Sequence, residues 1–202
     1  MVMGNLREQL AAAVPEVDHL LIFTETGTAA PPLNHLAVVD TYHKFAAEFL
    51  PRCPIVDPRG KPIRIRKENF PKFLNLSAAP GTVPRKPSTI VESIENGTFD
   101  ESEYEWARDR IQALFWVPDV LGDPDAIYTK HPSHGLIRAE EVYVKVYNKM
   151  GSTVKLVFVD YFGKSKDPIF ITSFLTSATT AMKHCKGEPI YRRTHKPQKP
   201  PG

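Results

Sequence analysis

The chain has 202 residues, of which 42% are hydrophobic; this is enough for one domain with an accessory segment or for two small domains, and it excludes a chain disordered throughout. Its 26 basic and 23 acidic residues leave a formal net charge of +3, a bias too small to identify a polyanion as the partner. The apolar runs are short and the start of the chain has no extended hydrophobic stretch. We therefore expect a cytoplasmic protein without a membrane span or a secretory signal.

The first third of the chain is predicted to be helical and irregular. A short helix is expected over residues 6–14 and a short strand over residues 19–23. From residue 34 to residue 50, apolar residues recur at helical spacing and predict a helix that faces the core. A β-hairpin is predicted next, over residues 54–65, because Asp-Pro-Arg-Gly supplies turn chemistry between two β-prone runs.

The segment after the hairpin is basic and aromatic. Two phenylalanines, at positions 70 and 73, lie among the cations Arg64, Arg66, Lys67 and Lys72. If these side chains all face one way, they would attract the backbone of a nucleic acid. The alternative is a solvated strand edge whose charges discourage aggregation.

A linker rich in proline, residues 77–88, is the predicted boundary within the chain. We expect a helical and irregular segment with a β-hairpin over residues 1–85, and an α+β domain over residues 86–193. Residues 194–202 are too rich in Pro and Lys to pack, and we expect a disordered basic tail there.

Two helices are predicted after the linker. Ser88 is expected to cap the first, which reaches Glu95. Asp100 and Glu103 form a plausible capping box for the second, an amphipathic helix that continues to about Trp116.

The most informative stretch covers residues 141–174, where three consecutive β-prone runs predict an antiparallel meander. In the first run, the alternation separates three valines from Tyr143, Lys145 and Tyr147. One face can be buried while the other offers a cation flanked by two phenols, which suits a phosphate and a base. A slip of one residue in the strand pairing would send Lys145 to the opposite face.

The motifs of several enzyme classes are absent: the phosphate loop with GKS or GKT, GxSxG, HExxH and the dinucleotide fingerprint. Cys53 and Cys185 lie far apart without a CxxC pair, so we expect no structural zinc site. We also expect no other metal and no cofactor. The scattered Lys, Arg, His, Tyr and Thr residues suit metal-independent cleavage of RNA. That reaction needs a base for the 2′-hydroxyl, an acid for the leaving 5′-oxygen and cations for the charge on phosphorus.

The order of several short phrases resembles the phage-associated nucleases of the superfamily that groups barnase, EndoU, the tRNA-cutting colicins and RelE. The phrases are RIQALFWVPDVLGDPDAIY, VYVKVYN, VKLVFVD, IFITSF and EPIYRR, which lie between Arg108 and Arg193. The resemblance implies an α+β fold with N-terminal helices packed on a small antiparallel β-sheet. It also implies a metal-independent endoribonuclease of toxin or phage-processing type.

Carried over to this sequence, the resemblance implies a catalytic set of Arg110, Lys145, Thr172 and Ser173. The two cations would stabilise the phosphate through contacts worth about 1.5 to 3 kcal/mol each, and Thr172 would hydrogen-bond a phosphate oxygen. Relatives often place a His after the early hairpin, where this chain offers Lys72, so the proton acceptor is left open between Lys72, Lys67, His131 and His134. The expected substrate-binding residues are Lys67, Tyr143, His131, His134 and Tyr191.

The sequence leaves two alternatives to the endoribonuclease hypothesis. One is a noncatalytic module of a phage or mobile element that binds nucleic acid or a protein, and the other is a purely structural domain. For the enzyme, the expected partners are RNA, with tRNA among the candidates, and a cognate inhibitor protein, but no membrane. The enzyme requires Arg110, Lys145, Thr172 and a basic or imidazole side chain in one cleft.

Overall fold

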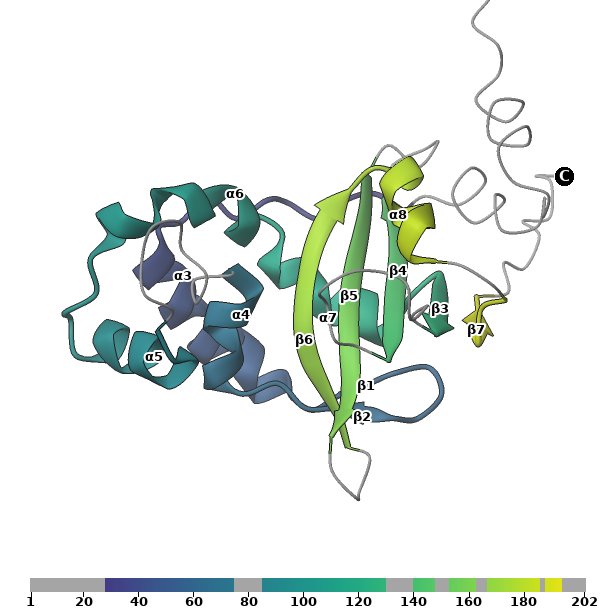
Figure 1. The fold of residues 1–202 in the computed structure, drawn as a ribbon, viewed down its shortest axis with the longest axis horizontal. Coiled ribbons are helices and arrows are strands. Elements are labelled where there is room, and N and C mark those ends of the chain that lie inside the picture. The colour runs from purple at the N-terminus through teal and green to yellow at the C-terminus, as the bar shows by residue number, and fades with distance from the viewer. Residues whose placement is uncertain are drawn as a thin grey trace, which may run out of the picture.

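The computed structural model of the chain describes residues 28–74, 85–129, 140–147, 153–162, 167–185 and 188–193 (Figure 1). Over these ranges the fold is mixed α+β with two antiparallel sheets, which confirms the coarse fold class predicted from the sequence. None of the helices described is both long and apolar enough to cross a membrane. The helix predicted over residues 6–14, the strand over residues 19–23, the tail, His131 and His134 lie outside the described residues.

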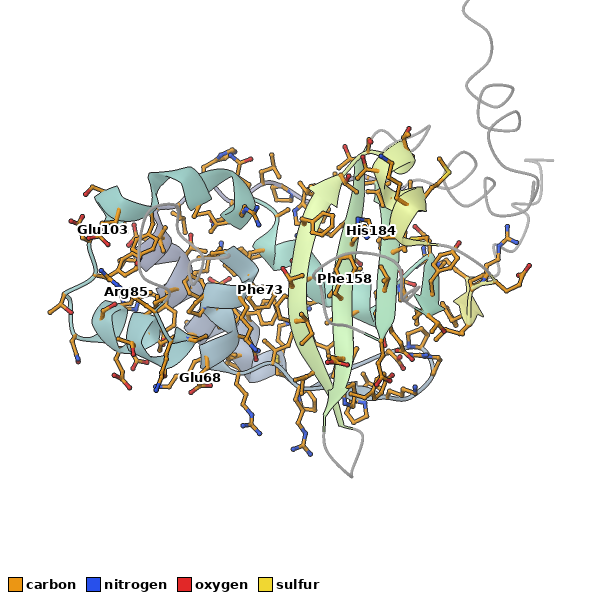
Figure 2. All side chains as sticks on the ribbon, viewed as in Figure 1. Glu68, Phe73, Arg85, Glu103, Phe158 and His184 are labelled. Atoms are coloured by element: carbon orange, nitrogen blue, oxygen red, sulfur yellow. The ribbon has the colours of Figure 1, made fainter. Side chains whose placement is uncertain are left out.

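Most of the helical elements form a group beside one edge of the larger sheet (Figure 1). Two further helices pack on the two faces of that sheet. The group consists of α3 (Val38–Lys44), η1 (Phe45–Phe49), η2 (Leu50–Arg52), η3 (Lys67–Asn69), α4 (Phe70–Leu74), α5 (Pro87–Glu95), η5 (Glu101–Ala107) and α6 (Arg108–Ile111). After η6 (Leu114–Trp116), α7 (Val117–Gly122) packs on one face of the sheet. On the opposite face lies α8 (Ala178–His184), where the ring of His184 is 5.5 Å from that of Phe158 on the sheet (Figure 2).

The larger sheet has the strand order β6-β5-β4-β3-β7. Its strands are β3 (Ala126–Thr129), β4 (Glu141–Tyr147), β5 (Thr153–Phe162), β6 (Asp167–Thr176) and β7 (Tyr191–Arg192). The antiparallel pairing of β4 with β5 and of β5 with β6 confirms the predicted meander. The smaller sheet pairs β1 (Ile55–Val56) with β2 (Pro62–Ile63), which confirms the predicted hairpin. Gly60 adopts a φ of 81° in its turn, a conformation that glycine favours.

Two hydrophobic cores lie on the two faces of the larger sheet. Val142, Val144 and Val146 of β4 face α8, whereas Tyr143 and Tyr147 face the core that includes α7 and the helical group. Every residue of β4 is buried, because both faces of this central strand are covered. The sequence prediction of an open face on β4 was therefore wrong.

The larger core joins residues on both sides of the predicted boundary near residue 85. Phe45 and Phe73 come from the segment before the boundary, and Phe170 comes from β6. The ring centroids of Phe73 and Phe170 are 3.8 Å apart, and Figure 2 shows Phe73 next to β6. The boundary does not separate two cores over the described residues, because the early helices complete the core of the sheet.

The amphipathic pattern up to Trp116 folds into shorter pieces than predicted. Tyr104 breaks the helix with φ −124° and ψ 17°, and the chain continues as η5, α6 and η6. Asp100 accepts hydrogen bonds from the N–H and hydroxyl of Ser102, at 2.9 and 2.7 Å, in a local turn. The residues at helical spacing still face the core, since Tyr104 and Ile111 are buried.

Candidate anion-binding pocket

Lys145 is buried, with 2% of its surface exposed. Its ammonium group forms hydrogen bonds with α7 and with Asp123, the residue that follows α7. The Nζ atom donates to the backbone oxygen of Asp123 at 2.6 Å, to Asp123 Oδ2 at 2.9 Å and to Asp119 Oδ1 at 3.2 Å. Tyr147, on the same face, donates to Asp119 Oδ2 at 2.8 Å. These contacts give Lys145 a role in joining α7 to the sheet rather than in presenting a charge on an open surface.

Tyr143 belongs to a second buried network, which ties the hairpin to the sheet. Its hydroxyl donates to Asp57 Oδ2 at 2.8 Å and accepts from Arg59 Nη2 at 2.7 Å. Burial, together with Glu141, raises the pKa of Tyr143 far above its usual range. Arg59 also bonds both oxygens of Glu141, at 2.6 and 3.0 Å. The phenol is fully buried and engaged by neighbours on the hairpin.

The other residues of the predicted catalytic set do not join Lys145. Arg110 is exposed on α6 in the helical group. Thr172 is paired with Phe158 on the α8 side of the sheet, and Ser173, being the next residue along the strand, points to the opposite side and is buried. Tyr191 lies on β7, where it pairs with Ile127 at the far edge of the sheet. The four predicted catalytic residues are therefore dispersed, and the single cleft that the enzyme hypothesis requires is not formed by them.

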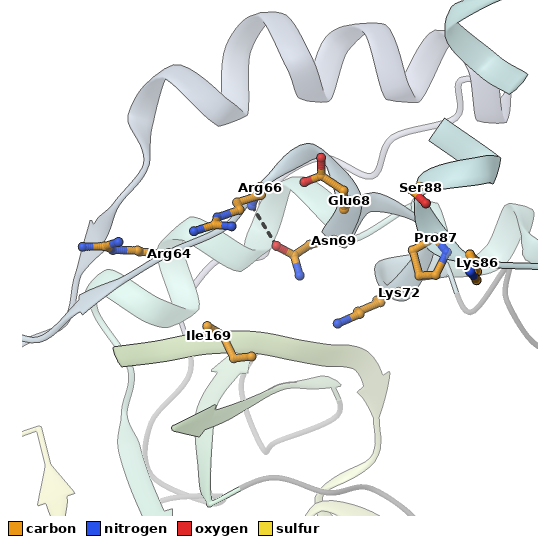
Figure 3. Close-up of a pocket in the computed structure, with 9 residues that line it drawn as sticks. All are labelled: Arg64, Arg66, Glu68, Asn69, Lys72, Lys86, Pro87, Ser88 and Ile169. Atoms are coloured by element: carbon orange, nitrogen blue, oxygen red, sulfur yellow. Dashed lines mark hydrogen bonds between the residues drawn. The ribbon is translucent and has the colours of Figure 1, made fainter. Parts of the chain in front are cut away.

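Lys72, the candidate proton acceptor, lies in a different place: a pocket of about 680 Å³ between the helical group and β6 (Figure 3). The lining residues described are Arg64, Arg66, Glu68, Asn69, Lys72, Lys86, Pro87, Ser88 and Ile169. In Figure 3, Lys72 and Asn69 point into the space above Ile169, with Arg64 and Arg66 at one end and Lys86 at the other. We call this set the basic pocket.

Local sequence patterns explain why these residues line the basic pocket. In the extended segment after the hairpin, Ile63 and Ile65 are buried while Arg64 and Arg66 are exposed, as strand alternation requires. The N–H of Arg64 donates to the backbone oxygen of Pro168 at 3.2 Å, which holds this segment against the start of β6.

The helices α4 and α5 form the rest of the wall. Phe70 and Phe73 anchor α4 in the core, and this leaves Lys72 on the side that faces the pocket. Pro87 begins α5 after Lys86, the N-cap residue, so both lie at the pocket end of the helix. Ser88 makes no cap bond there, in contrast to the prediction, because the helix begins at Pro87, two residues earlier than a cap at Ser88 implies.

Cations outnumber carboxylates among the described residues that line the basic pocket. Four cations and one carboxylate line it, and none of these four cations forms an ion pair with another described residue. The neighbouring cations are neutralised: Lys67 pairs with Glu95 at 3.1 Å, and Arg85 pairs with Glu103 at 3.2 Å (Figure 2). Like charges gathered around a concave, poorly compensated site focus a positive potential there. Such a site attracts an anion.

Sequence reasoning recognised the basic segment but missed Lys86 and the site as a whole. Lys86 comes from the linker, where the string PRKP was the only signal. Sequence reasoning also missed Lys155, which is directly opposite Lys145 in the β4–β5 register and is 1% exposed. Burial lowers the pKa of Lys155 to about 7.

Comparison of the chain with models of protein families, with curated proteins and with solved structures finds no match. The fold and the site define an α+β protein with a pocket suited to anions, and its function is inferred from the chemistry of that pocket.

Proposed function

We propose that the protein is a noncatalytic nucleic-acid-binding module, and that the phosphates of RNA bind in the basic pocket. The observation that carries this proposal is that four cations line one cavity without an ion pair to any described residue, beside cations that are paired with carboxylates. Phosphate oxygens supply the charge that the pocket lacks. Arginine can bind them through two parallel hydrogen bonds, and lysine binds them as a point charge.

Binding without cleavage is favoured by the positions of the residues predicted to be catalytic. Lys145 is held by Asp119 and Asp123, and Arg110 lies on the exposed surface of α6. General acid–base cleavage needs its donors and acceptors within hydrogen-bond reach of one phosphodiester. The pocket, by contrast, requires only that its cations face a phosphate.

The endoribonuclease with a barnase/EndoU/colicin/RelE-like fold is our second proposal. Its support is that Lys72, a predicted proton acceptor, lines the pocket together with Arg64 and Arg66. Those arginines would then stabilise the charge on the scissile phosphate. This proposal ranks second because the remaining predicted catalytic residues lie elsewhere.

The decisive variant is Arg64→Ala combined with Arg66→Ala. We expect it to bind a fluorescently labelled RNA at least about tenfold more weakly than the unchanged protein in an anisotropy titration, because two charge-assisted contacts are lost. The slope of log affinity against log salt should also become shallower, since fewer counterions are released. A suitable control is Lys183→Ala, which removes an exposed cation on α8, a helix that contributes no described residue to the pocket.

Incubation of the unchanged protein with RNA in EDTA separates the two proposals. Intact RNA together with binding that depends on Arg64 and Arg66 supports the binding module. Cleavage that leaves a 2′,3′-cyclic phosphate, and that is lost in Lys72→Ala, would establish the enzyme instead. Absence of RNA binding at low salt, or equal binding by the double variant, would refute a role for the pocket.

A further inference from the structure

We propose that the basic pocket binds a terminal phosphomonoester of a nucleic acid in preference to an internal phosphodiester. This inference rests on the proposed function and specifies which phosphate the pocket takes. It follows from the size of the cavity, from the chemistry of its walls and from the number of its charges.

The size of the cavity matches a compact group rather than a long strand. A volume of about 680 Å³ lies within the range of pockets for small molecules, roughly 300 to 1,000 Å³. Sites that follow a single strand cover about 4 to 16 nucleotides per OB fold and take the form of grooves. The pocket therefore has room for about one nucleotide with its phosphate rather than for a strand of several.

None of the described residues that line the pocket offers an aromatic ring on which a base could stack. The two phenylalanines of the neighbouring helix, Phe70 and Phe73, are 0% and 2% exposed and belong to the core. Since strands bound independently of sequence are usually held by stacking on aromatic rings as well as by charge, recognition here must depend on the phosphate.

The charges of the pocket match a dianion better than a monoanion. Four cations, Arg64, Arg66, Lys72 and Lys86, line the pocket, and Glu68 is the single carboxylate among the described lining residues. A phosphomonoester carries about −1.5 to −2 charges at pH 7 and has three strong acceptor oxygens, whereas an internal phosphodiester carries a single charge. The extra charge and oxygen add attraction where several cations line one cavity, as Arg64, Arg66, Lys72 and Lys86 do.

A neutral donor adds to this set. Asn69 Oδ1 accepts the N–H of Arg66 at 2.7 Å, which turns the amide nitrogen of Asn69 toward the pocket in Figure 3. The start of α5, a nine-residue helix, adds a positive partial charge at Ser88. Donors thus reach the cavity from the segment after β2, from η3, from α4 and from α5.

The test uses one short RNA sequence in four forms: with a 5′-phosphate, with a 3′-phosphate, with hydroxyls at both ends and as a closed circle. Competition against a labelled 5′-phosphorylated RNA at pH 7.5 should show that one or both phosphorylated forms bind at least about tenfold more tightly than the hydroxyl-ended and circular forms, because the added charge meets several cations. The phosphorylated form that binds more tightly, 5′ or 3′, identifies the end of the RNA that the pocket binds. In Lys72→Gln and in Lys86→Gln the preference should fall several-fold, while Lys183→Gln on α8 should retain it.

The pH dependence is an independent readout. The second ionisation of a phosphomonoester lies near pH 6, so its charge falls as the pH decreases from 7.5 to 5. The advantage of the phosphorylated RNA over the hydroxyl-ended RNA should shrink over that interval. The charged side chains that line the pocket are those of Arg64, Arg66, Lys72, Lys86 and Glu68.

Failure of the preference for a terminal phosphate can be distinguished from failure of the proposed function. Equal affinity for all four forms, with binding still dependent on Arg64 and Arg66, would overturn the preference for an end and leave the proposed function standing. No binding of any form would overturn both. A preference that persists unchanged in both Lys variants, or across the pH interval, would place the recognition of the end outside the pocket and refute the inference.

Discussion

Replacing Arg59 with methionine is expected to lower the free energy of unfolding by about 3–5 kcal/mol, because it leaves the buried Asp57 without a paired cation among the described residues, and Glu141 with Lys61 alone, at 3.4 Å. Arg59 Nη2 lies 2.6 Å from Asp57 Oδ2 and 2.6 Å from Glu141 Oε2. The side chains of Asp57 and Glu141 are 0% and 9% exposed, and that of Arg59 is 18% exposed, so solvent screens these pairs little. Urea unfolding at pH 7 measures the effect.

The pH dependence of the same variant provides a second check. Burial pushes the pKa of Asp57 upward, but hydrogen bonds from the Lys61 N–H, from Arg59 and from Tyr143 outweigh it and hold the pKa below its ordinary value. For Glu141, hydrogen bonds from Arg59 and Tyr161 likewise outweigh burial. A depressed carboxyl pKa contributes stability that is present above the unfolded value, near 4, and is lost as the pH falls through the folded value.

We therefore expect the unchanged protein to lose stability below about pH 4 and the Arg59→Met variant to lose much less there. The matched control is Arg64→Met, because Arg64 is also an arginine near the hairpin but is exposed and makes no ion pair with a described residue. A loss of stability in Arg59→Met no larger than in the control would show that the network contributes nothing.

Replacing Lys155 with methionine is expected to raise the free energy of unfolding by about 2–4 kcal/mol at pH 7, since one pKa unit corresponds to about 1.4 kcal/mol. Burial lowers the pKa of this lysine to about 7, so folding either strips its proton or buries its charge. Its register partners are Lys145 on β4 and Leu175 on β6, and the ammonium of Lys145 already engages the nearby carboxylates of Asp119 and Asp123. Methionine has a similar shape and carries no charge.

Because burial lowers the pKa of Lys155, the direction in which pH changes the stability of the protein follows. Between about pH 7 and the ordinary lysine pKa near 10.4, the unfolded chain holds a proton that the folded chain has released. The stability of the unchanged protein should therefore rise with pH over this window, by up to about 1.4 kcal/mol per unit. Lys155→Met should show a flatter profile, measured by urea unfolding from pH 7 to 9.5.

Lys183→Met removes an exposed lysine from α8 and serves as the control, with an expected profile like that of the unchanged protein. Equal pH slopes in Lys155→Met and in the unchanged protein would mean that Lys155 is protonated in both states throughout the window. A loss of stability in Lys155→Met would show that the amine has a favourable role in the fold.

The sequence was sufficient for elements defined by neighbouring residues. The alternation from Glu141 to Phe174 predicted the meander, and the turn residues between Pro54 and Ile65 predicted the hairpin. Period and turn chemistry are local properties, so no knowledge of the rest of the fold is needed to recognise them. The same alternation placed Tyr143, Lys145 and Tyr147 together on one side of β4, where the structure has them.

Only the tertiary structure decided what covers each side of the sheet and which cations meet. The packing of α7 on one face and α8 on the other buried Lys145 within reach of Asp119 and Asp123, at a site where the strand alone predicted an open surface. The basic pocket likewise joins Arg64, Lys86 and Ile169, which are far apart in the sequence. Whether a charge ends up beside a carboxylate or faces solvent depends on long-range packing, and a period of two or of 3.6 residues carries no information about that partner.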